Sequence, residues 1–131
     1  MKLNSMSFFQ LASQRMSWLA ANQRVVAENI ANADTPGFKA REVSPFEALV
    51  DGSRTGGVRT THAGHIQGGG HAGGLRATAD SAAWETTIDG NTVVLEQQTL
   101  KAAEISESYQ LAAQLYGKGH QLLGIAVGSN R

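Results

Sequence analysis

Apolar residues recur at alternating intervals of three and four positions in the first third of the chain and again in the last third. The first repeat ends shortly before Pro36, and the second continues without a break from residue 95 to residue 126. This spacing predicts two long α-helices, each with one apolar face. The residues that we expect to form the packing seam of these helices are Met16, Leu19, Val26, Ile30, Leu95, Ala102, Ile105, Tyr109, Ala112, Tyr116 and Leu123.

Local signals set the expected limits of the first helix. Ser7 and Gln10 have the spacing of a capping box, so we expect the helix to begin at Ser7. It should end before Pro36, because a proline disfavours helical backbone at the residue that precedes it. Thr35-Pro36-Gly37-Phe38 suits a type II turn, with proline at the second position and glycine at the third. After this turn, residues 39–43 are expected to be extended.

Two further helices are predicted in the same way. Ser44-Pro45-Phe46-Glu47 is a second capping box with proline at the first helical position, and it predicts a short helix that Gly52 stops. The last helix should run from about residue 92 to residue 127, with Asn91 or Thr92 as its N-terminal cap.

Glycine is concentrated in the middle of the chain. Nine of the 15 glycines lie between Gly52 and Gly74, so we expect residues 52–80 to form a flexible loop or an irregular insert. The predicted fold is mainly α, with two long terminal helices that pair as a coiled-coil-like bundle. The glycine-rich middle can hold short extended segments and one short helix. The three expected segments are 1–34 (N-terminal helix), 35–90 (turn, short helix and insert) and 91–131 (C-terminal helix).

Composition limits what this chain can do alone. Lys+Arg and Asp+Glu are equal at 11 each, which argues against a nucleic-acid-binding protein. Leu, Ile, Val and Phe together make up 28 of 131 residues, so we expect part of the apolar surface to pack against another chain. The N-terminus lacks the uninterrupted apolar run of a secretory signal, and the chain has no cysteine.

No catalytic, metal or cofactor site is predicted. His62 and His65 are three positions apart, but no third ligand stands near them at the spacing of a metal site. His71 lies in the same glycine-rich segment, and His120 lies on the last helix. The glycine run 68–74 lacks the Lys-Ser/Thr ending of a phosphate-binding loop. We therefore expect no enzyme activity, no cofactor, no nucleic-acid partner and no small-molecule substrate.

The end of the first predicted helix carries the most informative motif. Its sequence, Ala27-Glu28-Asn29-Ile30-Ala31-Asn32-Ala33-Asp34-Thr35-Pro36-Gly37-Phe38-Lys39, resembles the signature of the bacterial flagellar rod and hook proteins. Its two asparagines are three apart and share a helix face, where their amides can bond to backbone groups or to a neighbour and fix the helix register. The motif residues that we single out are Asn29, Ile30, Asn32, Thr35, Pro36, Gly37 and Phe38.

The resemblance implies a structural subunit of the flagellar basal body. The chain length and the run Asp89-Gly90-Asn91-Thr92-Val93 are similar to those of a proximal-rod member of the family. Membership would imply helical assembly with copies of itself, with other proximal-rod proteins and with the adaptor FliE at the membrane ring and export gate. It would also imply export without a cleaved signal peptide and a place in the rod that crosses the periplasm, where the rod transmits torque.

Two other functions stay open from the residues alone. One is an axial or needle-like subunit of a non-flagellar type III secretion system, although such subunits are not marked by the Thr35-Pro36-Gly37 turn. The other is a small module that binds an acidic ligand through the Gly-, His- and Arg-rich loop. Deleting residues 53–75 would abolish binding by such a module but would still allow a rod subunit to assemble.

Overall fold

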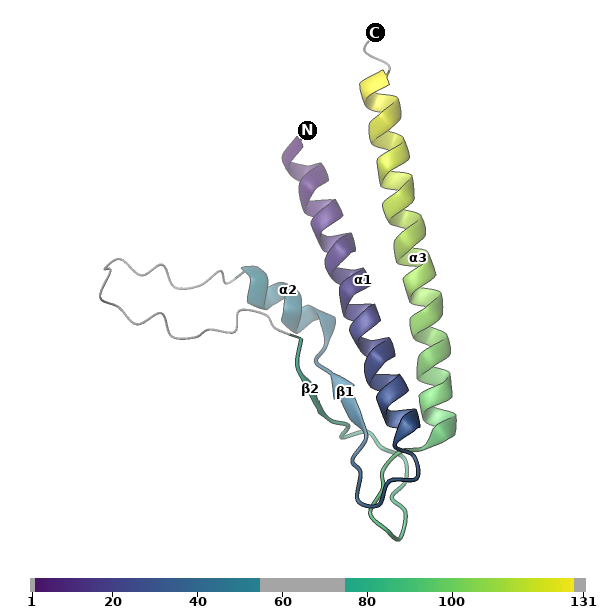
Figure 1. Cartoon of the computed structure of the whole chain (residues 1–131). Coiled ribbons are helices and arrows are strands. Elements are labelled where there is room, and N and C mark those ends of the chain that lie inside the picture. The colour runs from purple at the N-terminus through teal and green to yellow at the C-terminus, as the bar shows by residue number, and fades with distance from the viewer. Residues whose placement is uncertain (1, 55–74, 129–131) are drawn as a thin grey trace, which may run out of the picture.

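The computed structural model describes residues 2–54 and 75–128, and its architecture is a helical hairpin with a small β-ribbon on one side (Figure 1). The mainly α class with two long, paired terminal helices is confirmed. The elements in chain order are α1 (Lys2–Ala31), β1 (Arg41–Val43), α2 (Phe46–Arg54), β2 (Ala77–Ala79) and α3 (Leu95–Gly128).

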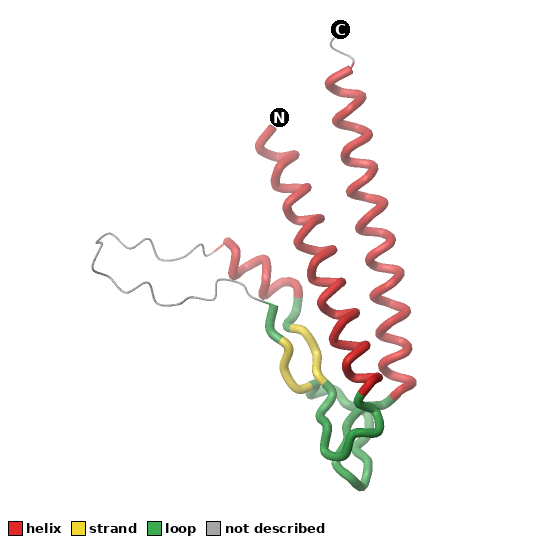
Figure 2. The backbone as a smooth tube through the Cα atoms, in the orientation of Figure 1, coloured by secondary structure: helices red, strands yellow, loops and turns green. Residues whose placement is uncertain are grey.

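Helices α1 and α3 run antiparallel along each other, so both chain ends lie at the same end of the molecule (Figures 1 and 2). We call this end, formed by residues 7–16 and 112–128, the open end. The opposite end, where α1 stops and α3 starts, is the closed end; it comprises residues 29–43 and 79–101. The chain passes through the β-ribbon and α2 between these two helices.

The buried core is small and runs along the contact between the two long helices. From α1, Leu19 is only 2% exposed and Val26 is also buried, while Ala112 is buried on α3. Val25 on α1 and Val43 on β1 are buried as well, on the side of the ribbon. The core is thus thin and made largely of small and β-branched side chains, as the composition predicts.

Strands β1 and β2 pair antiparallel and place Arg41 opposite Ala79 and Val43 opposite Ala77. The indole Nε1–H of Trp18 on α1 donates to the carbonyl of Ser44, 2.7 Å away, which fixes the chain as it leaves β1. The guanidinium of Arg15 lies over the rings of both Trp18 and Phe46, so α2 is held against α1 by cation–π contacts. These contacts hold the ribbon and α2 beside α1.

Three predicted helix boundaries are wrong. Helix α1 already begins at Lys2, because no Gly or Pro interrupts the residues before Ser7 and a capping box is only a local preference. Helix α2 continues through Gly52 to Arg54, since a glycine costs only about 1 kcal/mol in a helix and does not forbid it. Helix α3 begins at Leu95 rather than at about residue 92.

The predicted insert is described only in part. Strand β2 lies within the span 52–80 and is one of the short extended segments that the fold prediction allowed. Residues 55–74, with His62, His65 and His71, lie outside the described residues. In the portion that the structure does describe, no helix combines the length and the hydropathy that a membrane span needs.

Candidate functional site

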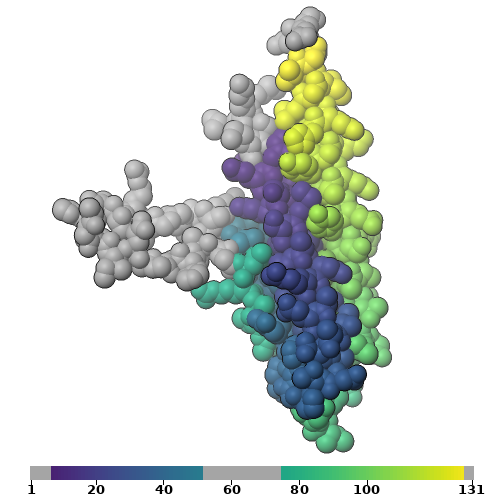
Figure 3. All heavy atoms as spheres, viewed as in Figure 1, coloured from purple at the N-terminus to yellow at the C-terminus, as the bar shows by residue number. Residues whose placement is uncertain are grey.

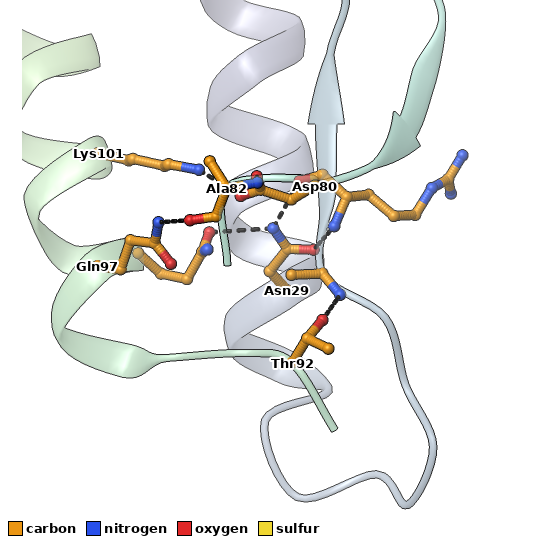
Figure 4. Close-up of polar contacts among 9 residues, drawn as sticks. Asn29, Asp80, Ala82, Thr92, Gln97 and Lys101 are labelled. Carbon is orange, nitrogen blue, oxygen red and sulfur yellow. Dashed lines mark hydrogen bonds and ion pairs between the residues drawn. The ribbon is translucent and has the colours of Figure 1, made fainter. Parts of the chain in front are cut away.

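The centre of the candidate site is the end of α1, where Asn29 joins three elements. This side chain is 1% exposed. Its Nδ2 donates to the Arg41 carbonyl at 2.8 Å and to Gln98 Oε1 at 3.0 Å, while its Oδ1 accepts the Arg41 backbone N–H at 2.9 Å (Figure 4). One amide therefore fixes α1 against both β1 and α3, and the hydrogen-bonding role predicted for it is present.

Asn91 binds the same helix end from the other side. It is also 1% exposed, and its Nδ2 lies 2.8–2.9 Å from the carbonyls of Asn32, Ala33 and Thr35. These carbonyls belong to the turn that directly follows α1, and those of Asn32 and Thr35 also accept the backbone N–H groups of Thr35 and Phe38. The buried amide of Asn91 therefore fixes the chain at the end of α1 against the segment that leads into α3.

The prediction that Asn91 or Thr92 caps α3 is therefore wrong. The first helical bond of α3 runs from Gln98 N–H to the Val94 carbonyl, at 3.0 Å, which makes Val94 the capping position. Thr92 instead accepts the Ala40 N–H at its Oγ1, at 2.8 Å, and its own N–H donates to the Phe38 carbonyl at 3.0 Å. Both residues serve the long-range contacts of the closed end.

The turn that follows α1 has the geometry expected from its sequence. Phe38 N–H donates to the Thr35 carbonyl at 3.2 Å, and Gly37 has a φ of 71°, as the third position of a type II turn requires. Gly37 N–H also donates to the Asp89 carbonyl at 2.9 Å. A Cβ on Gly90, whose φ is 83°, would lie 3.6 Å from the Gly37 Cα, so the two loops of the closed end touch through glycines.

Asp80 and Lys101 form an ion pair beside this network, in which the carboxylate is buried and the lysine side chain is half-buried. The Lys101 Nζ lies 2.6 Å from the Asp80 carboxylate, whose side chain is fully buried, and the Ala82 N–H donates to the same carboxylate at 2.8 Å. Gln97 Nε2 in turn donates to the Ala82 carbonyl at 3.0 Å. Burial alone would raise the pKa of Asp80, but the hydrogen bonds from Lys101 and Ala82 and the charge of Lys101 together lower it.

The remaining motif residues lie at the end of α1 and in the turn that follows it. Asn32 is half-buried and bonds within its own helix end, donating to the Glu28 carbonyl at 2.8 Å and accepting from Thr35 Oγ1 at 3.2 Å. Ile30 is 41% exposed. Pro36 is exposed and Phe38 is half-buried.

The predicted seam divides into buried and exposed residues. Leu19, Val26 and Ala112 are buried, and Met16, Ala102, Ile105 and Tyr116 are half-buried in the hairpin. Four other seam residues are exposed in the single chain; these are Ile30, Leu95, Tyr109 and Leu123. At the end of α1 the buried position is Asn29 rather than the predicted Ile30, because this end of the helix packs against β1 as well as α3. Burial of the four exposed residues in an assembly stays a prediction.

Gln98 and the Asp80–Lys101 pair belong to the site, although the sequence pattern did not predict them there. Gln98 stands in the predicted apolar repeat and has no measurable exposure, so a polar residue in an otherwise apolar register was the available signal. Among the described residues, no three His, Asp or Glu side chains gather as a metal ion would need. His120 packs against the rings of both Phe9 and Tyr116, with centroids 4.5 and 4.8 Å away.

The Asn-rich end of α1 and the Pro-Gly turn carry the sequence motif that resembles the axial proteins of the bacterial flagellum. The family model for flagella basal body rod proteins matches residues 9–39. The flagellar basal body rod protein FlgB of Agrobacterium fabrum is 34% identical over 135 residues, covering 95% of this chain and 96% of the relative. The FlgB proteins of Cereibacter sphaeroides and Salmonella typhimurium are 35% and 32% identical, covering 72% and 81% of this chain and 73% and 80% of those relatives.

The chain belongs to the family of the flagellar basal body rod protein FlgB. Its relatives are structural proteins of the flagellum, and the non-flagellar and ligand-binding alternatives are not favoured.

Proposed function

We propose that the chain is a structural subunit of the proximal part of the flagellar basal-body rod. It assembles helically, connects the membrane ring to the distal rod and hook, and transmits torque. The observation that carries this proposal is a hairpin whose closed end is ordered by buried amides while most of its longest helix stays uncovered. Membership of the FlgB family supports the same function.

Large apolar side chains are exposed along much of α3. Leu111 is 58% exposed and Leu122 and Ile125 are each 67% exposed. Trp84 and Ile88, on the loop between β2 and α3, are also exposed at the closed end. Apolar surface of this extent on a small chain indicates contact with other chains rather than with water.

The partners follow from this surface and from the family. We infer contacts with copies of the chain itself, with other proximal-rod proteins, and with the adaptor FliE and the export gate at the membrane ring. Residues 1–34 and 91–131 would form the rod core, and residues 35–90 would form an appended segment. We place the subunit in the part of the rod that crosses the periplasm, reached through the flagellar export apparatus without a cleaved signal peptide and with no enzymatic role.

A deletion strain tests the proposal. Because everything distal is built on the rod, cells without this chain should make no hook and no filament, and a plasmid copy should restore both. Hooks are counted by electron microscopy and swimming is measured in soft agar. A deletion strain that swims with normal filaments would contradict the proposal.

A further inference from the structure

One long face of α3 carries exposed leucines, with two carboxylates and one ammonium group among them. We call this face the leucine ridge, and it comprises Leu100, Glu104, Glu107, Leu111, Leu115, Lys118 and Leu122. All seven are exposed, and the leucines are 51–67% exposed. A helix face of this kind, apolar with a few charges, is typical of a helix–helix interface.

The outer face of α1 is its opposite in shape and charge. We call it the small-residue stripe, and it comprises Ser13, Ser17, Ala20, Arg24 and Ala27, all of them exposed. Its only charge is the guanidinium of Arg24. A shallow hollow lined by Phe9, Gln10, Ser13 and Gln14 lies where the stripe reaches the open end. Figure 3 shows α1 uncovered along the side turned to the viewer.

The two faces lie on opposite sides of the hairpin. On α1 each stripe residue directly follows a residue of the inward-facing register, as Ala20 follows Leu19. On α3 the order is reversed: most ridge residues directly precede a residue of the inward-facing register, as Leu111 precedes Ala112. Successive residues of a helix are about 100° apart around its axis. The stripe therefore lies about 100° after the inward face of α1, and the ridge lies about 100° before the inward face of α3, each in the direction of its own chain. Because the helices are antiparallel, these opposite turns place the two faces back to back.

Contacts within the hairpin show which residues of the two faces lie at the same height. The ring of Phe9 meets that of Tyr116, with centroids 5.3 Å apart, and Asn29 bonds to Gln98. Counting along the antiparallel helices from these pairs puts Arg24 level with residues 101–103, Ser17 with residues 108–110 and Ser13 with residues 112–114. Glu104, Leu111 and Leu115 each lie one to three residues further along α3 than these levels. A single axial shift of the second copy by one to three residues therefore brings all three opposite Arg24, Ser17 and Ser13 together.

We propose that the leucine ridge of one copy packs onto the small-residue stripe of a second copy, side by side and in the same direction. This inference rests on the proposed assembly of the chain and names the surfaces that it uses. Leu111 and Leu115 fill the space above Ser17 and Ser13, and Arg24 of the second copy pairs with Glu104 and Glu107. The two oppositely charged sets meet only in this register, which fixes the axial position of one copy against the next.

The geometry makes this interface an open-ended one. Ridge and stripe are different surfaces, so a copy that uses its ridge keeps its stripe free for another copy. Each α3 then lies antiparallel to the α1 of the next copy, and the alternation of up and down helices in the hairpin continues from subunit to subunit.

Cysteine cross-linking tests the contact, because the chain has no cysteine of its own. A variant that carries both Ser17→Cys and Leu111→Cys should give a ladder of dimers, trimers and larger products when rods in cells are oxidised. Each single variant should give no product with itself, and the two single variants expressed together should stop at dimers. Ser81→Cys with Leu111→Cys is the control, since Ser81 is exposed but lies on the closed-end loop.

The outcomes separate this inference from the proposed function. Self-linking of Leu111→Cys would show a symmetric contact and would overturn the proposal. Normal hooks without any disulfide between the cysteines introduced at positions 17 and 111 would overturn it too, while leaving the rod function intact. If the double variant makes no hooks, the two single variants are expressed together in the presence of the wild-type chain. A disulfide between positions 17 and 111 would then support the proposal, and its absence would overturn it.

Charge exchange tests the register. Arg24→Glu should abolish hook formation because three carboxylates would meet, and Glu104→Arg with Glu107→Arg should abolish it because three cations would meet. The chain that carries all three changes should recover swimming in soft agar. Glu85→Arg, on the exposed closed-end loop, is the matched control and should swim normally. Normal swimming of Arg24→Glu, or no recovery in the triple variant while each single change is well expressed, would contradict the pairing.

Discussion

At the closed end of the hairpin, buried amides join α1 to β1 and α3, whereas at the open end the helices meet through aromatic rings. Asn29 and Asn91 are each 1% exposed, and every polar atom of their side chains has a hydrogen-bond partner. At the open end, Phe9 packs edge-on against Tyr116 with centroids 5.3 Å apart, and residues 121–128 of α3 are all exposed.

The two kinds of contact differ in what they specify. A hydrogen-bonded amide that is buried fits only one register, since a shift of one residue would leave its donors and acceptors without partners. Rings and leucines tolerate a shift with little loss of contact area. The closed end therefore sets the geometry of the single subunit, and we expect other chains to complete the open end.

The largest effect on the single chain is expected at Asn29. Replacing it with Ala leaves the N–H and carbonyl of Arg41 and the Oε1 of Gln98 without their partner, at a cost of about 2–4 kcal/mol in the free energy of unfolding. Urea denaturation followed by circular dichroism measures this loss, and amide exchange should show it at the end of α1.

Asn22→Ala is the control for this change. The Nδ2 of Asn22 donates only to the Trp18 carbonyl of its own helix, so its loss should cost less than about 0.5 kcal/mol. Equal losses for the two variants would mean that the closed end does not depend on its buried amide.

A smaller effect is expected at the open end, where two neighbouring glycines of α3 differ in surroundings. A Cβ on Gly117 would meet nothing within 4 Å, so Gly117→Ala should raise the stability of the free chain by about 1 kcal/mol. A Cβ on Gly119 would lie 2.8 Å from Cε1 of Phe8 and 3.1 Å from Cε1 of Phe9. Gly119→Ala must displace these rings, which offsets the gain in helix propensity.

Thermal unfolding of the two variants measures the difference. We expect Gly117→Ala to have the higher midpoint and Gly119→Ala to lie at or below the parent chain. A gain of the same size at both positions would show that α1 and α3 do not touch at the open end in solution.

The sequence predicted the helices better than the contacts between them, and the reason is physical. Periodicity and the Pro36-Gly37 turn are local signals, and both long helices and the turn are present in the structure. The hydrogen bonds from Asn91 to the turn after α1 join residues 56–59 positions apart, and no local sequence pattern predicts such a contact. The sequence therefore predicts Asn91 as a cap of α3, whereas its side chain binds the chain at the end of α1.

The strand pairing shows the same limit. Ala77–Ala79 has three residues, only one of which is β-branched, so nothing in its sequence predicts a strand. It becomes one because β1 is fixed beside it by Asn29 and by Trp18, whose partners lie at Arg41 and Ser44. The seam was predictable as a pattern, but its division into buried and exposed residues depends on where β1 covers α1.

The smallest effect is expected from acid, and it again concerns the closed end. Burial opposes ionisation of Asp80, yet the hydrogen bonds from Lys101 and Ala82 and the charge of Lys101 lower its pKa below 3.8, the ordinary value. A carboxyl whose pKa is lowered by folding stabilises the fold at pH values above its unfolded pKa, and this contribution is lost as the pH falls through the folded pKa.

Unfolding free energies measured from pH 7 down to pH 3 should therefore decline below about pH 4. Asp80→Asn should be less stable than the parent at pH 7, and its decline in acid should be shallower. The effect should be smaller than that of Asn29→Ala, because burial cancels part of what Lys101 contributes. Parallel acid curves for the two chains would show that the Asp80–Lys101 pair does not hold the closed end together.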